Sequence, residues 1–189
     1  MKHQKRIVVV TIILATLVIF IAGGFLFFNV RRIKTYNQFV ELYNTMSEGT
    51  IKAESADILI CNVWRNNIWE KADTQTDKYT RKNGGSGKFY DDFNDALNNL
   101  FEDETFIDDL VEIYSLKTKA ETLIKTLAKH PRAFDEEYSD FKDCYLMFVK
   151  FVEMPLSTEG KSLNSFTEEH NDLDTKLADK LRELDLYFE

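Results

Sequence analysis

An uninterrupted apolar segment, residues 7–28, constrains this chain more than any other feature of its sequence. It contains no charged residue and consists mainly of Val, Ile, Leu and Phe. A helix of this length extends roughly 33 Å at about 1.5 Å per residue, and the hydrocarbon core of a bilayer is roughly 30 Å thick. No other segment could enclose a helix that is apolar on all sides. The sequence therefore predicts one transmembrane helix over residues 7–28, which contacts the lipid bilayer.

The residues that flank this segment leave its orientation open. Three basic residues lie on each side of it: Lys2, Lys5 and Arg6 in a short tail over residues 1–6, then Arg31, Arg32 and Lys34. The positive-inside rule therefore gives a tie. The free α-amino group and the short tail favour a signal anchor with the C-terminal domain outside the cell. The opposite orientation is the alternative.

A cleavable signal peptide is a second alternative for the same segment. Such a peptide needs a shorter apolar stretch and a small-x-small cleavage site. Ala22-Gly23-Gly24 offers one site, but the apolar run continues as far as Phe28. The continuation favours a permanent anchor in the cell membrane.

The rest of the chain is strongly acidic. Six of the 24 basic residues precede Thr35 and all 32 acidic residues follow it, which leaves 18 basic and 32 acidic residues and a net charge of −14. Binding to nucleic acid requires a basic patch, so a nucleic-acid partner is not expected. The length suits one domain with its own core, which we place at residues 30–189.

Helical periodicity dominates this domain, and helix breakers are few. Pro occurs only twice, and no segment alternates apolar and polar residues as a strand does. We predict helices over residues 30–71, 88–101, about 105–130, 133–153, and from 162 or 165 to the C-terminal end. The polar segment 72–87 is expected to be a flexible loop. The predicted fold is all-α, with the N-terminal transmembrane helix continuing into an antiparallel four- to five-helix bundle.

Several details of these helices can be predicted from single residues. Gly49 is a possible soft point in the first helix. Thr105 with Asp108, and Ser165 with Glu168, have the spacing of capping boxes. His130 followed by Pro131 is typical of a helix end. The apolar face of the third helix is ambiguous, because Phe106 and Leu110 can continue through Ile113 or through Tyr114.

No pattern of residues indicates catalytic chemistry. His170 lies on the apolar stripe of the last helix, but Thr167 occupies the position where a di-iron motif needs Glu, so we interpret it as a core or boundary histidine. Adjacent acidic pairs such as Asp108-Asp109 point in different directions on a helix. We predict no catalytic residue, no cofactor and no metal site, and hence no enzyme. Cys61 and Cys144 have apolar neighbours and are expected to be buried, and their pairing is left open.

Two groups of aromatic residues are the remaining candidates for binding. An aromatic stripe runs from Phe134 to Phe148 and is interpreted as bundle core, with a ligand groove as the alternative. The second group combines Trp and Asn, whose polar side-chain groups cost free energy when they are buried without a hydrogen-bond partner. This group predicts either a buried polar network or an exposed partner surface. Its members are Trp64, Trp69, Asn66 and Asn67.

The C-terminal third adds a resemblance to these observations. The stretch from His130 to Phe166, above all Ser162-Leu163-Asn164-Ser165-Phe166 after Gly160, resembles uncharacterised single-pass membrane-anchored helical-domain proteins of Gram-positive bacteria. The resemblance implies a bacterial cell-envelope setting and no catalytic residues. We therefore expect a non-enzymatic binding or scaffold module that engages an envelope protein. A small-ligand-binding, sensor-like domain is the alternative, and the sequence does not indicate an oligomeric state.

Overall fold

The computed structural model describes the backbone of residues 2–188 and the side chains of residues 29–188. Four long helices dominate this part of the chain: α1 (Lys2–Ile68), α4 (Glu104–Leu127), α5 (Asp135–Val152) and α6 (Leu163–Asp185). Shorter elements connect them: α2 (Asp77–Thr80), α3 (Phe93–Phe101) and the 3₁₀ turns η1 (Arg132–Phe134) and η2 (Met154–Leu156). The predicted all-α class is confirmed for the described residues, which contain no strand.

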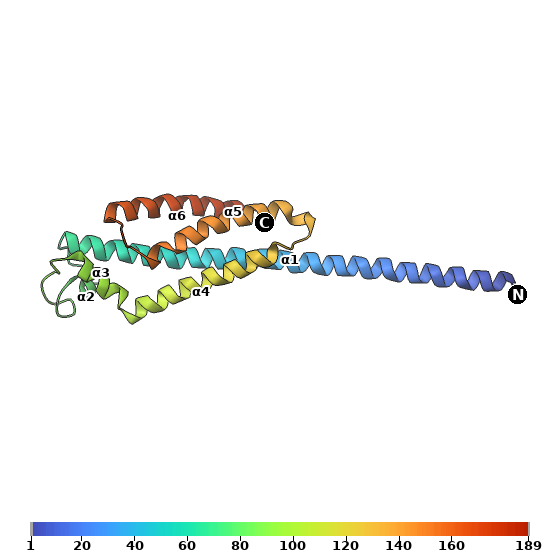
Figure 1. The fold of residues 1–189 in the computed structure, drawn as a ribbon, viewed down its shortest axis with the longest axis horizontal. Helices are drawn as coiled ribbons and strands as arrows, with labels where there is room; N and C mark the ends of the chain where they lie inside the picture. Colours follow the sequence, from blue (N-terminus) through green and yellow to red (C-terminus); the bar gives the residue numbers. More distant parts are fainter. Residues whose placement is uncertain (1, 189) are drawn as a thin grey trace.

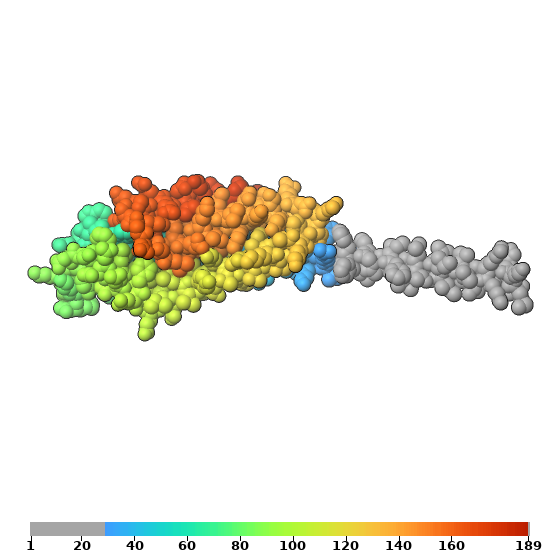
Figure 2. All heavy atoms as spheres, in the orientation of Figure 1, coloured from blue at the N-terminus to red at the C-terminus, as the bar shows by residue number. Residues whose placement is uncertain are grey.

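The long helices form an up-down-up-down bundle around α1 (Figure 1). Helix α4 returns antiparallel to α1. Helices α5 and α6 form a hairpin, in which α5 packs on both α1 and α4 and α6 packs on α1. Seen from one side, the atoms of α4, α5 and α6 cover most of the described part of α1 (Figure 2). We call the end that holds α2 and α3 the distal end, and the opposite end, which holds η1, the proximal end.

Periodic apolar residues fill the space between the helices. On α1 the buried positions follow helical spacing, as Phe39, Leu42 and Met46 illustrate. Phenylalanine supplies the largest fully buried side chains: Phe106, Phe141, Phe148, Phe151 and Phe166. One cluster contains all of these residues, so the described part of the chain has a single core.

The predicted transmembrane segment, residues 7–28, lies outside the residues whose side chains the structure describes. Helix α1 includes these residues in its backbone and passes into the bundle without a break. Among the residues that can be assessed, no helix combines the length and the apolar character that a membrane span needs.

Gly49 is a packing position in α1. The helix is unbroken there, although the sequence suggested a soft point. A Cβ atom at Gly49 would lie 2.8 Å from Cε2 of Phe148, whose side chain is fully buried. The missing side chain therefore lets α5 approach α1 closely, with the Phe148 ring pressed against the α1 backbone.

One helix start differs from its predicted cap, and another matches one of the two starts that the sequence allowed. Helix α4 begins at Glu104, because the Asp103 carboxylate accepts a hydrogen bond from the backbone N–H of Phe106. Helix α6 begins at Leu163 with a capping box between Ser162 and Ser165. The α4 cap therefore lies two residues before the predicted Thr105, since a nearby Asp satisfies the first free N–H groups equally well. The α6 cap is Ser162, the earlier of the two predicted starts, and the predicted capping box of Ser165 with Glu168 is replaced by one of Ser162 with Ser165.

The segment expected to be a flexible loop, residues 72–87, contains local structure. It includes α2, and an isolated antiparallel bridge pairs Arg81 with Phe89. The backbone of Gly85 has φ +94°, and a Cβ there would lie 3.1 Å from the carbonyl carbon of Asp77. Glycine therefore permits the turn to fold back on α2. The bridge also removes Phe89 from the second predicted helix, so α3 begins only at Phe93.

We predict that Gly49→Ala destabilises the bundle by about 1–2 kcal/mol. Alanine improves helix propensity by about 0.8–1.0 kcal/mol, but overpacking a buried site costs about 1–3 kcal/mol. Chemical denaturation of the variant would measure the change. Glu48→Ala, at the neighbouring exposed position, is the matched control and should leave stability nearly unchanged. In a Phe148→Leu background the cost of Gly49→Ala should shrink; an equal cost there would rule out the ring contact as its cause.

Candidate functional site

The predicted partner surface near the end of α1 is mostly buried. Trp64 stacks on Phe93 with ring centroids 5.5 Å apart and is only 2% exposed. Asn66 and Asn67 are 3% and 4% exposed. Trp69 alone reaches solvent, with 61% of its surface exposed. The four residues therefore do not form one surface, and a partner contact at Trp69 remains a prediction.

The two asparagines instead form the polar network that the sequence offered as the other interpretation. Asn66 Nδ2 donates to Thr76 Oγ1 at 2.9 Å. Asn67 Nδ2 donates to the carbonyl oxygens of Thr80 and Tyr90, both at 3.2 Å. These bonds satisfy buried acceptors and attach the distal segment to α1, so their role is structural.

An exposed apolar stripe lies on the outer side of α4. It consists of Ile107, Val111 and Tyr114, which are 41%, 62% and 58% exposed. The spacing of four and three residues places them on one face of the helix. We call these three residues the α4 stripe. The ambiguity in the sequence is thereby resolved: Ile113 is fully buried and Tyr114 faces solvent.

Acidic side chains flank the α4 stripe. Glu104 and Asp108 are exposed and lie within one helical turn of Ile107 and Val111. A second copy of this chain would bring the same acidic flank against it, which disfavours self-association through this face. A partner that carries basic residues beside an apolar face would be complementary in both respects.

A groove of about 430 Å³ between α1 and α4 is a weaker candidate for a docking site. Its floor includes Ala56 and Phe106, which are already buried at 5% and 2% exposure. Ile51, at 64%, is its main exposed apolar side chain, and an ion pair between Lys52 and Glu112 links the two helices nearby. Covering this groove would remove less apolar surface from water than covering the α4 stripe.

The aromatic stripe of α5 belongs to the core. Phe134, Phe141 and Phe148 are buried, at 8%, 0% and 0% exposure. The cavity that touches both Phe134 and Phe141 has a volume of about 70 Å³ and adjoins Phe39 and Phe188. Sites for small organic ligands usually measure about 300–1,000 Å³, so this cavity is too small for the ligand groove that the sequence left open.

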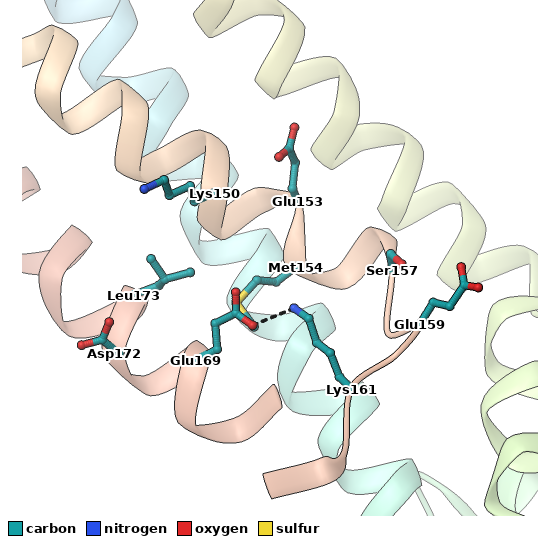
Figure 3. A pocket seen from close by; sticks show the side chains of 9 residues that line it. All are labelled: Lys150, Glu153, Met154, Ser157, Glu159, Lys161, Glu169, Asp172 and Leu173. Carbon is teal, nitrogen blue, oxygen red and sulfur yellow. Dashed lines mark ion pairs between the residues drawn. The ribbon is translucent and has the colours of Figure 1, made fainter. Parts of the chain in front are cut away.

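A larger cleft of about 510 Å³ opens between η2 and the first turns of α6 (Figure 3). Charged side chains of both signs line it, including Lys150, Lys161 and Asp172. Lys161 Nζ pairs with Glu169 Oε2 at 2.8 Å, and the sulfur of Met154 lies behind that pair. The cleft therefore offers alternating charges at a partly open surface.

A buried ionisable pair joins α1 to α6 and is the most unusual polar feature of the core. His170 Nδ1 donates to Asp57 Oδ2 at 3.1 Å. Asp57 is fully buried, and His170 is 8% exposed with its ring against Phe151, 5.4 Å between centroids. Asp57 Oδ1 has no hydrogen-bond partner among the described residues. The interpretation of His170 as a core or boundary residue fits this placement.

The surroundings of the pair shift both pKa values upward. Burial raises the pKa of Asp57 to about 6, although the hydrogen bond from His170 acts in the opposite direction. The hydrogen bond to Asp57 raises the pKa of His170, and burial opposes that shift. The folded protein therefore holds protons at this pair more tightly than the unfolded chain does.

Asp57 is the residue that the sequence reading missed. It lies four residues after Ala53 and three before Ile60, both fully buried, so its position falls on the core face of α1. A charged residue at such a position is a signal for a buried partner. The partner itself is 113 positions away and could not be inferred from spacing.

Both cysteines are buried free thiols. Burial raises the pKa of the Cys61 thiol, whose sulfur lies 3.7 Å from Thr167 Oγ1. Burial also raises the pKa of Cys144, to about 12. Protonated thiols are poor nucleophiles, so neither residue is suited to thiolate chemistry. Among the residues that the structure describes, no group of three or more potential ligands could hold a metal ion.

We predict that the Asp57–His170 pair makes the protein less stable as pH rises. Both pKa values are higher in the folded state, so the pair favours folding below the unfolded values, near 3.8 and 6.5. That contribution is lost as pH rises from about 4 through about 6 for Asp57, and above 6.5 for His170, because the folded protein must then release protons that it binds more tightly.

The difference in unfolding free energy between the wild type and Asp57→Asn, measured across this pH range, isolates the pair from other carboxylates. We expect the difference to change by about 1–3 kcal/mol. Asp91→Asn is a matched control at a side chain that is 97% exposed. A pH-independent difference for Asp57→Asn would contradict the assigned shifts.

Comparison with known proteins gives no further guide to the site. No family model, no curated protein and no solved structure matches the chain. The resemblance to membrane-anchored helical proteins of Gram-positive bacteria therefore remains a sequence-based prediction. Any functional assignment must come from the residues described above.

Proposed function

We propose that the chain is a membrane-anchored, non-enzymatic binding module of the bacterial cell envelope. Residues 7–28 would hold it in the bilayer, and the acidic bundle would stand outside the cell. The exposure of the α4 stripe is the observation that carries the binding role. Its three apolar side chains face solvent, while the side chains on the opposite face of α4 are buried in the core.

The chemistry of the α4 stripe defines the partner. Removing apolar surface from water stabilises a complex by about 25 cal/mol per Å² before the costs of association are counted. Glu104 and Asp108 beside the stripe favour cationic side chains at the edge of the contact. The partner is therefore an envelope protein that presents an amphipathic helix with a basic flank.

Chemical crosslinking on intact cells tests this proposal. A cysteine introduced by Val111→Cys would react with a membrane-impermeant reagent that joins a thiol to an amine. We expect one crosslinked partner protein, because lysines of a basic flank would lie within reach. The native cysteines are buried with raised thiol pKa values, so they should react slowly.

Leu146→Cys is the matched control, since Leu146 is an exposed apolar residue on α5, at 51%. It should not give the same adduct. In addition, Tyr114→Arg combined with Val111→Cys should abolish the adduct, because it places a cation against the basic flank without adding an amine that the reagent could link to the cysteine. Equal adducts from both cysteine positions would contradict a role for the α4 stripe. An adduct that forms only after the cells are permeabilised would contradict the extracellular orientation.

The charged cleft favours a second candidate function, a sensor-like domain for a small ligand. Lys150 and Lys161 stand opposite carboxylates across about 510 Å³, an arrangement suited to a small zwitterion. Such a ligand would raise the free energy of unfolding, by about 2.7 kcal/mol at a concentration one hundred times its dissociation constant. Amino acids and other small zwitterions that leave the unfolding free energy unchanged would exclude this alternative.

A further inference from the structure

Basic side chains gather at the proximal end of an otherwise acidic bundle. We call five of them the basic collar; all are exposed, three belong to α1, and two belong to the connection between α4 and α5. They are Arg31, Arg32, Lys34, Lys129 and Arg132. Two further exposed residues of this part of α1 are apolar: Val30, at 65%, and Ile33, at 61%.

A hydrogen bond holds the two parts of the collar, on α1 and on the connection between α4 and α5, at the same height along the bundle axis. Arg31 Nη2 donates to the carbonyl oxygen of Lys129 at 3.1 Å, across 98 positions of sequence. The connection between α4 and α5 is therefore held beside Arg31, rather than farther along the bundle. Because the bond uses the main chain of Lys129, the Lys129 side chain is available for other contacts.

The rise per residue of α1 gives the distance between Arg31 and the end of the predicted transmembrane segment. Arg31 follows Phe28 by three residues, or about 4.5 Å along α1. The polar headgroup layer on each side of a bilayer is about 5–7 Å thick, since a bilayer measures about 40–45 Å overall around a core of about 30 Å. A connection held beside Arg31 would therefore lie at the depth of the headgroups.

We infer that the basic collar binds the phosphate groups of phospholipid headgroups and seats the bundle on the bilayer surface. This inference rests on the proposed anchor over residues 7–28. Arginine guanidinium groups bind phosphate through two parallel hydrogen bonds, and lysine binds it as a point charge. The exposed Val30 and Ile33 side chains suit the boundary between headgroups and acyl chains.

Acidic residues near the collar reduce its charge without cancelling it. Asp135, Glu136 and Glu137 form the first turn of α5, and Asp135 Oδ1 already accepts a hydrogen bond from His130 Nε2 at 2.9 Å. The five cations of the collar exceed these three acids. Most of the remaining bundle is acidic and would be repelled by anionic lipid, so the collar is the surface of the bundle that fits phosphate.

The test uses the full chain reconstituted in phospholipid nanodiscs that contain a lipid with a nitroxide on its headgroup. A fluorophore is attached at a cysteine introduced by Ala133→Cys, an exposed position beside Arg132. The control attaches it through Lys88→Cys at the distal end. We expect strong quenching at position 133 and none at position 88.

Charge reversal then tests the role of the cations. Lys129→Glu with Arg132→Glu should weaken the quenching at position 133, because the Arg31 bond to the main chain of Lys129 remains while the side-chain attraction to phosphate is lost. Lys71→Glu with Lys88→Glu at the distal end should leave the quenching unchanged. High salt should weaken the quenching, because the Debye length falls from about 10 Å at 0.1 M to about 3 Å at 1 M. Circular dichroism of each variant would establish that the helices remain folded.

The possible failures are distinguishable. If the chain stays in the nanodisc but position 133 is not quenched, the collar does not reach the headgroups and this inference is overturned while the anchor stands. Quenching that is equally strong after charge reversal would overturn the role of the collar cations. If the chain is not retained in the nanodisc, the proposed anchor fails, and this inference fails with it.

Discussion

The bundle depends on the packing of three helices against one face of α1. Helices α4, α5 and α6 all contact α1, and the core side chains of α1 occupy helical spacing from Phe39 to Trp64. Small residues on that face, such as Gly49 and Ala53, permit close approach. An isolated helix gains little stability in water, so the order of the bundle arises from this shared burial. Any change that weakens the face of α1 should affect all three partners together.

Helical periodicity was sufficient to predict the long helices and their order. The distal segment was not predictable in the same way, because its structure depends on contacts with residues elsewhere in the chain. Asn67 binds the carbonyl groups of Thr80 and Tyr90, and these bonds hold a polar stretch whose own sequence shows no periodicity. The start of α4 was also displaced, since Asp103 competes well with Thr105 as a cap, whereas α6 uses Ser162, one of its two predicted starts.

In the candidate sites, too, the sequence identifies unusual residues, but only the fold shows which residues they contact. The sequence marks His170 as a residue on an apolar face, but only the fold brings it to Asp57. It marks Trp64 as a large aromatic residue, and only the fold shows that its ring stacks on Phe93. The α4 stripe was not recognised because α4 has apolar residues around more than half of its circumference. Which of them form the core depends on where α1 and α5 lie.

The proposed function links these observations through α1. If residues 7–28 form the anchor, the same unbroken helix carries the predicted span, three of the five residues of the basic collar and the Asp57 side of the buried pair. The bundle would then be held close to the bilayer in a fixed orientation, with the α4 stripe presented to neighbouring envelope proteins. A flexible joint between anchor and bundle would remove that orientation.

Hydrogen exchange of backbone amides between residues 20 and 40, measured on the full chain in phospholipid nanodiscs, tests this continuity most directly. A single helix that leaves the bilayer and enters the bundle predicts slow exchange throughout the range, because each amide is hydrogen-bonded and residues 7–28 are shielded by lipid. Exchange near the unprotected rate around residues 28–34 would reveal a joint and contradict the account. Fast exchange before residue 28 would contradict the anchor itself.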